Sequence, residues 1–566
     1  MPPTDWWKTA VFYQIYPRSF ADGNGDGVGD LAGMIARLDY LRDLGVDALW
    51  LSPHYPSPQF DCGYDVANYT GVADEYGTLA DFQRFLDGAH DRGMRVILDL
   101  VLNHTSHLHP WFQASAAGHD NPYADWYIWH PGRDGGPPNN WLSLFGGPAW
   151  EWVPERGEYY YHFFFKQQPD LNWRNPAVRQ AIYDVMRFWY ARGVDGFRLD
   201  AIGTLFEDPA LPDQRSSVTP ERLLHWTDGP MSAEDMLALD VAYRDLFAYQ
   251  GGQPGIHDIM RELRAVNDEF PGRMLIGETD EVAYYGRADD ELHMVFNFPL
   301  MRTPRLTPAW VRANRADWVA SLPPGAWPAN TLGNHDNARL FNRYGDGAHD
   351  AALARLSLAL VLLLPGTPFL YNGEEIGMTD LALPALEQMK DLTAHWRYHV
   401  ERDYYPASPA MALEAAVAHG RDKCRTPLQW ANAPNGGFSP VGVTPWLPVN
   451  PNYAAGVNVA DQEADPGSLL NFYRQLLRVR RATPALQSGL LEWLPPEAED
   501  YLAWVRRGEA EDALVVLNFS AQPIVAALGP QAAQARTRFG SGAVAPDGTL
   551  GLEPFGIYIG ALARSV

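Results

Sequence analysis

The sequence has few cysteines, an excess of acidic over basic residues and no long apolar run, and each feature excludes a class of protein. Two cysteines, Cys62 and Cys424, are too few for the disulfide framework of a small secreted domain, and they cannot form a structural zinc site by themselves. No apolar stretch reaches the roughly 18 residues that a membrane-spanning helix needs. We therefore expect free thiols and no membrane span.

The N-terminus bears on the expected location of the protein, and the net charge bears on its ligands. The opening residues lack the basic patch, apolar stretch and cleavage site of a signal peptide, which favours a cytoplasmic protein. With 44 basic against 69 acidic residues the net charge is −25, which opposes binding to nucleic acid or to an anionic membrane surface. The 20 Trp, 27 Tyr and 24 Phe residues suit a neutral sugar, whose apolar faces stack on aromatic rings, although such rings also build the core.

Short apolar runs alternate with amphipathic helical stretches along most of the chain, as expected for βα units around a parallel sheet. The helical stretches at 30–45 and 78–93 carry apolar residues at helical spacing and end in glycine. Eight such units predict an α/β protein with a (β/α)8 TIM barrel. The expected strands lie within residues 11–20, 47–53, 95–104, 194–202, 273–278, 293–298, 329–336 and 367–375.

Two long excursions interrupt this alternation. Residues 104–172 contain aromatic residues, Pro and Gly without a clear long helix, and a second excursion covers about 376–463. The tail has short β-like runs typical of a small antiparallel domain. The expected domains are a barrel in two parts, 1–103 and 173–483, an inserted subdomain B, 104–172, and a C-terminal β domain, 484–566.

Acidic residues follow several of the expected strands. Asp200 ends the fourth strand, Glu278 the fifth and Asp336 the seventh. The C-terminal ends of the strands meet at one mouth in a TIM barrel, so these three carboxyl groups should converge there. Glycoside hydrolysis needs two of them, one carboxylate at the anomeric carbon and one carboxylic acid that protonates the leaving oxygen.

Five ordered motifs at these strand ends resemble the α-amylase superfamily of glycoside hydrolases, and within it the α-glucosidase and oligo-1,6-glucosidase branch. The resemblance spans nearly the whole chain. The motifs are DLVLNHT (99–105), QPDLN (168–172), GFRLDAI (196–202), IGETD (276–280) and GNHDN (333–337).

The resemblance implies roles for the residues at the mouth. Asp200 would be the nucleophile that forms a covalent glucosyl intermediate, Glu278 the general acid and then base, and Asp336 the stabiliser of the transition state. Opposite charge on Arg198 should keep Asp200 ionised, while the general acid must stay protonated near neutrality. His104 and His335 resemble histidines that bind sugar hydroxyls in this superfamily.

A clamp on the terminal glucose is also implied. Asp61 and Tyr64 occupy the place where the branch has an Asp and a stacking Tyr, and Arg425 resembles the partner of Asp61. An Asp–Arg pair of this kind would close the pocket beyond one sugar unit and make the enzyme act from chain ends. Phe164 resembles an aromatic of the pocket wall, and Arg339 should lie nearby.

The segment ADGNGDGVGD, residues 21–30, has the alternate Asp and Asn spacing of an EF-hand but carries Gly33 at the twelfth position, where that motif needs Glu. From its residues alone the segment is either a surface turn or a metal loop. The branch binds a structural Ca2+ or Mg2+ in its first loop, and the resemblance implies oxygen ligands. These are Asp22, Asn24, Asp26, the backbone carbonyl of Val28, and Asp30.

Linkage preference depends on one position. In this branch a small residue after the nucleophile, here Ala201, resembles α-1,4-acting enzymes, whereas Val resembles α-1,6-acting ones. We therefore expect an exo-acting α-glucosidase with short maltose-type substrates and some transglucosylation. The alternatives are a trehalose synthase or sucrose-isomerase-type transglucosylase, and a non-enzymatic transporter subunit, which would lack the carboxylates and carry an anchor.

The two cysteines flank the expected clamp, because Cys62 follows Asp61 and Cys424 precedes Arg425. If the clamp forms, the two thiols should lie near each other behind the pocket, reduced by default and able to form a disulfide only if their α-carbons approach within about 7 Å. Two unrelated buried thiols are the alternative.

Overall fold

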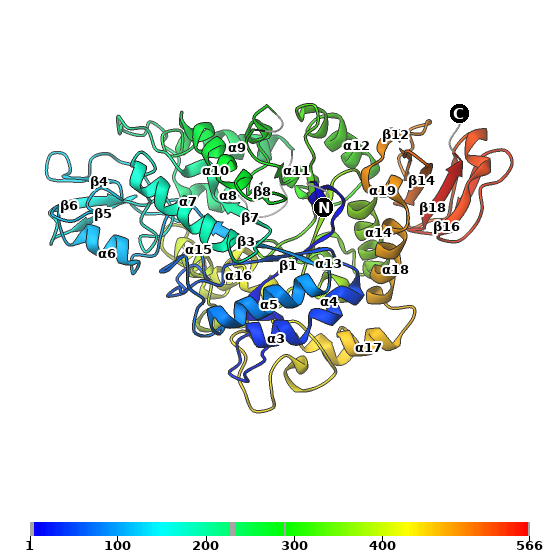
Figure 1. The fold of residues 1–566 in the computed structure, drawn as a ribbon, viewed down its shortest axis with the longest axis horizontal. Coiled ribbons are helices and arrows are strands. Elements are labelled where there is room, and N and C mark those ends of the chain that lie inside the picture. Colours follow the sequence, from blue (N-terminus) through cyan, green and yellow to red (C-terminus); the bar gives the residue numbers. More distant parts are fainter. Residues whose placement is uncertain (1–4, 227–232, 288–289, 564–566) are drawn as a thin grey trace.

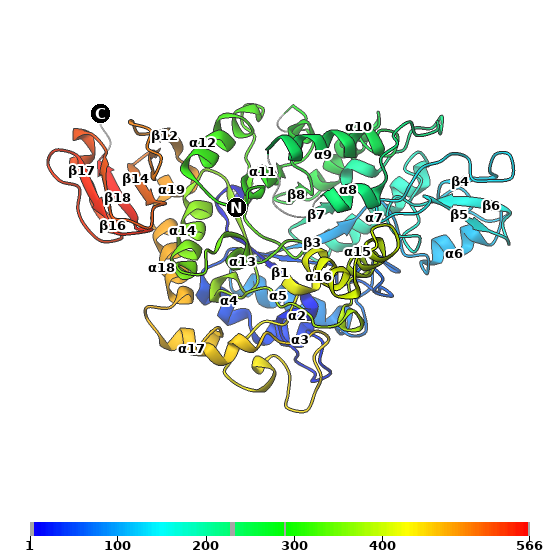
Figure 2. The ribbon, with the colours of Figure 1, turned by 180° about the vertical axis from the view of Figure 1, so that it is seen from behind.

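The structure is a computed structural model that describes residues 5–226, 233–287 and 290–563. It is elongated, with the barrel in the middle and two β-rich parts at the ends of the long axis (Figure 1). Figure 2 shows the same arrangement from behind. The expected fold class is confirmed.

In the described part of the chain, eight parallel strands form the barrel sheet in the order β10-β11-β1-β2-β3-β7-β8-β9. A parallel bridge between Phe296 and Ala329 joins the β9 side to β10 and closes the ring. Each strand lies within one of the eight expected segments. They are β1 (Phe12–Ile15), β2 (Ala48–Leu51), β3 (Arg95–Val101), β7 (Gly196–Asp200), β8 (Met274–Gly277), β9 (Met294–Val295), β10 (Ala329–Thr331) and β11 (Thr367–Tyr371).

Both faces of the barrel strands are buried, as expected for a parallel sheet covered by helices. Every residue of β1, β2 and β8 is buried. Helices alternate with the strands along this part of the chain. They are α1 (Trp6–Thr9), α2 (Pro17–Phe20), α3 (Leu31–Ala36), α4 (Leu38–Leu44), α5 (Leu79–Asp91), α7 (Pro176–Tyr190), α8 (Pro220–Trp226), α9 (Ala233–Leu246), α10 (Ile256–Asp268), α11 (Phe298–Met301), α12 (Pro308–Ala316), α13 (Leu340–Tyr344) and α14 (Asp350–Leu363).

Local sequence sets where these helices start. Thr78 caps α5 through its hydroxyl, and the carboxylate of Asp81 accepts from the Thr78 backbone in return, which is a capping box. Asn175 caps α7, and Pro176 occupies its first position. Gly45, with φ 102°, ends α4 in the left-handed region that glycine adopts without strain.

The long connection after β3 carries its own small sheet, in the order β4-β6-β5. This part projects from one end of the molecule beside α6 (Figure 1). Its aromatic residues pack on one another; the Trp141 and Tyr161 rings, for example, lie 5.7 Å apart. The elements are α6 (Pro110–Ala116), β4 (Trp129–His130), β5 (Trp150–Val153) and β6 (Glu158–Tyr161).

The connection after β11 is mainly helical and irregular, and the chain then ends in antiparallel sheets at the opposite end of the molecule (Figures 1 and 2). The connection and the joint contain α15 (Leu392–Asp403), α16 (Pro409–His419), α17 (Val459–Ala464), α18 (Leu469–Arg481) and α19 (Pro484–Ser488). The terminal strands are β12 (Leu490–Trp493), β13 (Tyr501–Arg507), β14 (Glu511–Asn518), β15 (Ile524–Ala527), β16 (Arg536–Phe539), β17 (Thr549–Leu552) and β18 (Ile557–Ala563).

Candidate active site

Three carboxyl groups meet at the C-terminal end of the barrel strands, joined by one arginine. Arg198 on β7 donates from Nη1 to Asp200 Oδ1 at 2.6 Å and from Nη2 to Glu278 Oε1 at 2.6 Å. The same Nη1 lies 2.6 Å from Oδ1 of Asp99, a residue of β3. The guanidinium is almost completely buried, so it gathers these carboxylates in a water-poor environment.

Asp99 was not predicted as a site residue, although it opens the DLVLNHT motif. Its carboxylate is fully buried and also accepts from Tyr64 Oη at 3.0 Å and from Trp50 Nε1 at 3.2 Å. Burial raises the pKa of Asp99 to about 6, against the opposing charge of Arg198. Asp99 thus anchors Arg198 from below the mouth.

Asp200 and Glu278 act as a coupled pair. Burial, reinforced by the negative charge of Glu278, raises the pKa of Asp200 well above its ordinary value, and Arg198 opposes the shift without cancelling it. The predicted effect of Arg198 is present, but burial and Glu278 outweigh it in the substrate-free protein. That Asp200 is ionised during the reaction stays a prediction.

Ala201 contributes to the site through its backbone. Its φ of 47° lies in the left-handed region, which is rare for a residue other than glycine. The resulting turn after β7 aims the Ala201 N–H at Glu278 Oε2, 3.1 Å away. Ala201 thus helps to orient the carboxyl group of Glu278.

His335 links the mouth to the barrel floor. Gln14 Nε2 lies 2.7 Å from His335 Nδ1, and Tyr64 Oη lies 2.7 Å from His335 Nε2. Because the amide nitrogen of Gln14 can only donate, this arrangement fits a neutral imidazole that donates from Nε2. Burial lowers the pKa of His335 to about 3, which keeps the ring neutral. The Tyr64 ring stacks on His335 with centroids 5.5 Å apart.

Asp336 is held as an anion by basic neighbours. Burial alone would raise its pKa, but the positive charges of Arg425 and Arg421 lower it well below the usual range. Arg425 Nη2 lies 2.5 Å from Asp336 Oδ1, and Arg425 Nε donates to the His335 carbonyl at 2.8 Å. Arg425 therefore belongs to the site as the partner of Asp336.

The partner of Asp61 is Arg421, so the prediction that Arg425 fills this role was wrong. Arg421 Nη2 lies 2.8 Å from Asp61 Oδ1 and 2.7 Å from Asp391 Oδ1, while its Nε donates to Asp391 Oδ2 at 3.0 Å. The two arginines are four residues apart around the short turn at 422–424, and both side chains reach the mouth. Sequence position alone does not tell them apart.

Asp391 is a second residue that the sequence analysis missed. Its side chain is fully buried, caps α15 by accepting from Thr393 N at 3.1 Å, and also accepts from the Arg421 backbone N–H at 2.8 Å. Burial alone would raise the pKa of Asp391, but Arg421 outweighs it and lowers that pKa far below its usual value. Asp391 therefore fixes Arg421 from behind, and we call Asp61, Arg421 and Asp391 the clamp.

His104 and Phe164 lie together at the opposite wall. Gln168, from the QPDLN motif, donates from Nε2 to Asp61 Oδ2 at 3.0 Å and lies 2.9 Å from His104 Nε2. The ring centroids of His104 and Phe164 are 5.1 Å apart. Burial lowers the pKa of His104 to about 4. Gln168 thus ties the clamp to the wall that follows β3.

Arg339 differs from the other predicted sugar-binding residues in its contacts. Its guanidinium lies over the Tyr371 ring, 4.6 Å from the centroid, and donates to the Asn372 carbonyl at 2.5 Å. Its backbone N–H donates to Asp380. These contacts place Arg339 beneath the loop after β11, where it supports the backbone near the mouth.

The loop at 22–30 is held by its own side chains. Asp22 accepts from the N–H groups of Gly25 and Gly27, Asn24 accepts from that of Asp26, and Asp26 accepts from that of Val28. Asp30 is buried and caps α3. Among the described residues no group of three or more His, Cys, Asp or Glu side chains is arranged to hold a metal ion. The metal assignment, which also uses Asn and carbonyl oxygens, stays a prediction.

Both cysteines are free and buried. Burial raises the pKa of each thiol to about 12, although the positive charge of Arg425 acts on both. Cys424 donates to the His335 carbonyl at 3.3 Å, while Cys62 has a left-handed backbone with φ 50°. The expectation of free thiols is confirmed, and their mutual proximity stays a prediction. No helix among the described residues is long and apolar enough to cross a membrane.

Comparison with known proteins agrees with this geometry. The model of the α-amylase catalytic domain matches residues 14–489, and that of the maltogenic amylase C-terminal domain matches residues 491–559. The chain is 39% identical to an oligo-1,6-glucosidase of Parageobacillus thermoglucosidasius over 91% of this chain and 90% of that protein. It is 38% identical to an alpha-glucosidase of Pediococcus pentosaceus, covering 93% of each.

Solved structures of related enzymes are also similar to this chain. The trehalulose synthase MutB from Pseudomonas mesoacidophila MX-45 superimposes with a TM-score of 0.87 at 37% identity, covering 98% of this chain and 99% of that one. The alpha-glucosyl transfer enzyme XgtA superimposes with a TM-score of 0.83 at 38% identity, covering 99% of each. With its barrel, its converging carboxylates and these matches, the chain belongs to the α-amylase family of glycoside hydrolases.

Proposed function

We propose that the protein is a retaining, exo-acting α-glucosidase that releases α-glucose from the non-reducing end of short α-glucosides. The observation that carries the proposal is the placement of Asp200 and Glu278 on one guanidinium, that of Arg198, inside a mouth bounded by the clamp. Carboxyl groups that share one guanidinium favour the short separation of a retaining enzyme over the wider one of an inverting enzyme.

The residues divide the work in two steps. Asp200 attacks the anomeric carbon and forms a glucosyl ester while Glu278 gives its proton to the leaving oxygen; Glu278 then takes a proton from water, whose oxygen attacks the same carbon and releases Asp200. These roles require Asp200 to be ionised and Glu278 to carry a proton when substrate binds. Asp336, kept anionic by Arg425, stabilises the positive charge that develops on the sugar.

The clamp supports action from chain ends. Asp61 and Arg421 meet at 2.8 Å, and Asp391 holds Arg421 in place, so a sugar beyond the terminal glucose meets an ion pair. Tyr64, His104 and His335 are the groups nearest the clamp and the catalytic carboxylates that suit the hydroxyls and face of one glucose. Phe164 adds an apolar wall next to His104.

From Ala201 we propose a preference for α-1,4 linkages and maltose-type substrates. Relatives at similar identity carry the name oligo-1,6-glucosidase, so this preference needs a direct test.

The test compares kcat/KM for maltose and isomaltose in the wild type and in Ala201→Val and Ala201→Gly. We expect the wild type to prefer maltose, and Ala201→Val to shift the ratio toward isomaltose by about tenfold, the scale of one or two added methyl groups at a pocket wall. Ala201→Gly keeps the N–H and should not cause that shift. A wild type that prefers isomaltose would overturn the assignment.

A second candidate function is glucosyl transfer or sucrose isomerisation, because solved neighbours at 36–38% identity are a trehalulose synthase and an alpha-glucosyl transfer enzyme. The same covalent intermediate serves both outcomes, and the acceptor decides between them. Chromatography of products from maltose, isomaltose, sucrose and trehalose separates them. Free glucose as the main product supports the hydrolase, and a rearranged disaccharide as the main product supports the transferase.

We also propose that the loop at 22–30 binds a structural Ca2+ or Mg2+. Asp22, Asn24, Asp26 and the Val28 carbonyl offer the hard oxygen donors that such ions prefer. Asp30 has the right chemistry too, but its oxygens already accept from Gly23, Asn24 and Gly33. A bound ion would stabilise the fold by about 2.7 kcal/mol at a hundredfold excess over its dissociation constant. Chelation should therefore lower the Tm of the wild type and leave the Tm of Asp26→Ala unchanged; equal Tm and metal content in both proteins would favour a plain turn.

The proposed partners, location and domain bounds complete this assignment. The partner is a small oligosaccharide or glucoside, with neither nucleic acid nor membrane as a partner, in keeping with the net charge of −25. Free, buried thiols support a cytoplasmic location. We propose that subdomain B spans 104–172, that the barrel comprises 1–103 and 173–483, and that the β domain spans 484–566.

A further inference from the structure

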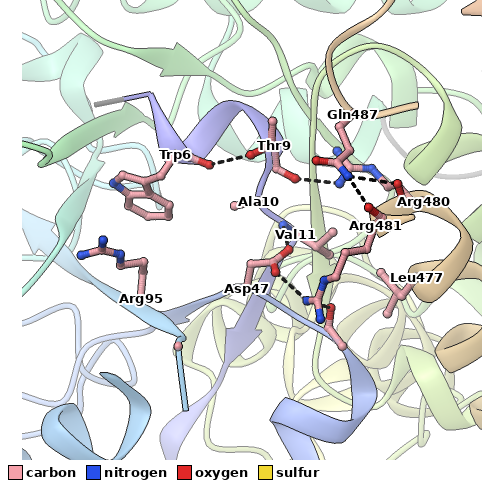
Figure 3. A pocket seen from close by; sticks show the side chains of 12 residues that line it. Trp6, Thr9, Ala10, Val11, Asp47, Arg95, Leu477, Arg480, Arg481 and Gln487 are labelled. Carbon is pink, nitrogen blue, oxygen red and sulfur yellow. Dashed lines mark hydrogen bonds and ion pairs between the residues drawn. The ribbon is translucent and has the colours of Figure 1, made fainter. Parts of the chain in front are cut away.

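A cavity of about 180 Å³ lies at the closed, N-terminal end of the barrel, opposite the carboxylate mouth (Figure 3). Its walls come from α1 and the start of β1, from the turns that precede β2 and β3, and from the C-terminal end of α18. Trp6, Asp47, Arg95, Arg480, Arg481 and Gln487 line it. The cavity therefore lies where the barrel meets the helices that lead to the C-terminal sheets.

Three of these lining residues are arginines, and only one is acidic. Arg481 Nη2 pairs with Asp47 Oδ1 at 2.6 Å. The other oxygen of Asp47 accepts from the Val11 backbone N–H. Arg95 pairs with Asp195 at 2.8 Å, but Arg273 shares that same carboxylate oxygen at 2.9 Å. The local charge is positive in a protein whose net charge is −25.

Arg480 carries a buried positive charge that no carboxylate of the described residues contacts directly. Its side chain is 2% exposed, and in the described part of the chain it makes no ion pair. Its Nε and Nη1 donate to the carbonyls of Leu362 and Thr9, at 3.1 and 2.7 Å, while Nη2 is buried with no partner. Burial lowers the pKa of Arg480 to about 10. A buried charge is normally paired, and the backbone carbonyls that accept from Arg480 carry only partial charges.

The nearby carboxylate of Asp47 attracts Arg480, but it is already paired with Arg481. Arg506 is also buried and donates only to carbonyls, and Arg480 is among the groups that lower its pKa, after burial, to about 9. The C-terminal end of α18 carries only the partial negative charge of a helix end. Gln487 already donates to its last carbonyls, those of Arg480 and Arg481 (Figure 3).

We propose that this cavity binds a small oxyanion, of the class of phosphate or sulfate, as a structural ligand between the barrel and the C-terminal part of the chain. The volume suits an ion of that size, and Arg95 and Arg481 place two further guanidinium groups at its wall. Guanidinium groups form paired hydrogen bonds with such ions. The oxyanion provides the negative charge that Arg480 lacks.

The test titrates inorganic phosphate into the purified full chain at constant ionic strength, with chloride as the balancing anion, and follows Tm and, by calorimetry, binding. We expect a saturable rise in Tm, because a ligand that binds only the folded state stabilises it by mass action. The affinity should fall by about tenfold or more in Arg480→Gln, the effect of losing one charged partner. Sulfate should compete with phosphate, whereas chloride should not.

The matched control is Arg478→Gln, which removes the same charge from an exposed position two residues earlier on α18. It should bind phosphate like the wild type. Arg481→Gln changes an exposed lining residue and covers the case in which Arg480→Gln does not fold; it should weaken binding as well. A rise in Tm that never saturates, or one that is equal in all four proteins, is the general effect of excluded salts and would overturn the proposal.

Discussion

The arginine side chains contact different groups at the two ends of the barrel. At the mouth, Arg198, Arg421 and Arg425 each meet at least one carboxylate, and Arg198 alone meets three. At the closed end, Arg480 and Arg506 are buried against backbone carbonyls only. The mouth uses shared cations to hold acidic groups that would otherwise repel, which is what a reaction through a positively charged transition state requires. The closed end has no such chemistry, so its unpaired cations point to a structural ligand.

The comparison predicts that changes at the mouth alter activity and changes at the closed end alter stability. The largest effect should come from Asp200→Asn, which removes the nucleophile. We expect kcat to fall by about 10⁴-fold or more, the scale seen when a nucleophile is lost. The Tm should not fall, because the change removes one of two repelling carboxylates while Arg198 keeps Asp99 and Glu278. Steady-state kinetics and thermal melts measure both quantities.

The control for that experiment is Asp213→Asn, an exposed change of the same kind. It should leave kcat unchanged. An Asp200→Asn protein that retained more than about a hundredth of the wild-type kcat would show that the nucleophile lies elsewhere.

A smaller effect is expected from Asp391→Asn, which loosens the clamp from behind. The amide can no longer accept from Arg421 with both atoms, so Arg421 should lose its fixed position against Asp61. We expect KM for maltose to rise by about tenfold with a lesser change in kcat, because a group that holds substrate in both ground and transition states mainly affects binding. Asp403→Asn on α15 is the control. An unchanged KM would mean that Asp391 only caps its helix.

Stability below neutrality should depend on His54, a fully buried histidine outside both ends. Both of its ring nitrogens are buried without a partner, and its ring stacks on Phe82 with centroids 5.0 Å apart. Burial lowers the pKa of His54 to about 3, below the unfolded value of about 6.5. The unfolded state therefore takes up a proton first, and stability falls as pH drops from about 6.5 toward 3.

The variant His54→Phe isolates this contribution. Between pH 6.5 and 4.5 the wild type should lose about 1.4 kcal/mol per pH unit more than the variant. Urea denaturation at three pH values within that range measures the difference in slope. Parallel curves for the two proteins would show that His54 is protonated, or has a partner, in the folded state.

The smallest effect is expected at the closed end from Arg481→Gln in buffer without oxyanions. The side chain of Arg481 is 58% exposed, and exposed ion pairs such as the one with Asp47 contribute about 1 kcal/mol or less. Maltose hydrolysis should be unchanged, since the residue lies at the opposite end from Asp200. A large loss of activity would break the division between the two ends.

Much of the mouth was predictable from sequence because its signals are local. Apolar runs ending in polar residues gave all eight strands, and the same strand ends carry Asp200, Glu278 and the Asp336 loop. The unpredicted parts depend on which distant side chains meet. Arg421 and Arg425 are both basic residues of one segment, and only the folded chain shows that Asp61 meets the first and that Arg425 is the nearer partner of Asp336.

The counterions were missed for a similar reason. Asp99 lies inside a strand that the apolar pattern already explained, and Asp391 lies in an excursion without a motif. The pKa of Asp200 also depends on burial and on Glu278 from the next strand, which together outweigh the predicted effect of the neighbouring Arg198. Residue type and spacing predict which groups reach the mouth, and packing decides how they share protons and charges.

The most direct test of the central claim is the configuration of the first glucose released from p-nitrophenyl α-glucoside, followed by ¹H NMR before the anomers interconvert. Attack by Asp200 followed by attack of water at the same carbon restores the original configuration, so the account predicts α-glucose as the first product. β-Glucose as the first product would contradict the covalent intermediate on Asp200, and with it the roles assigned to the carboxyl groups around Arg198.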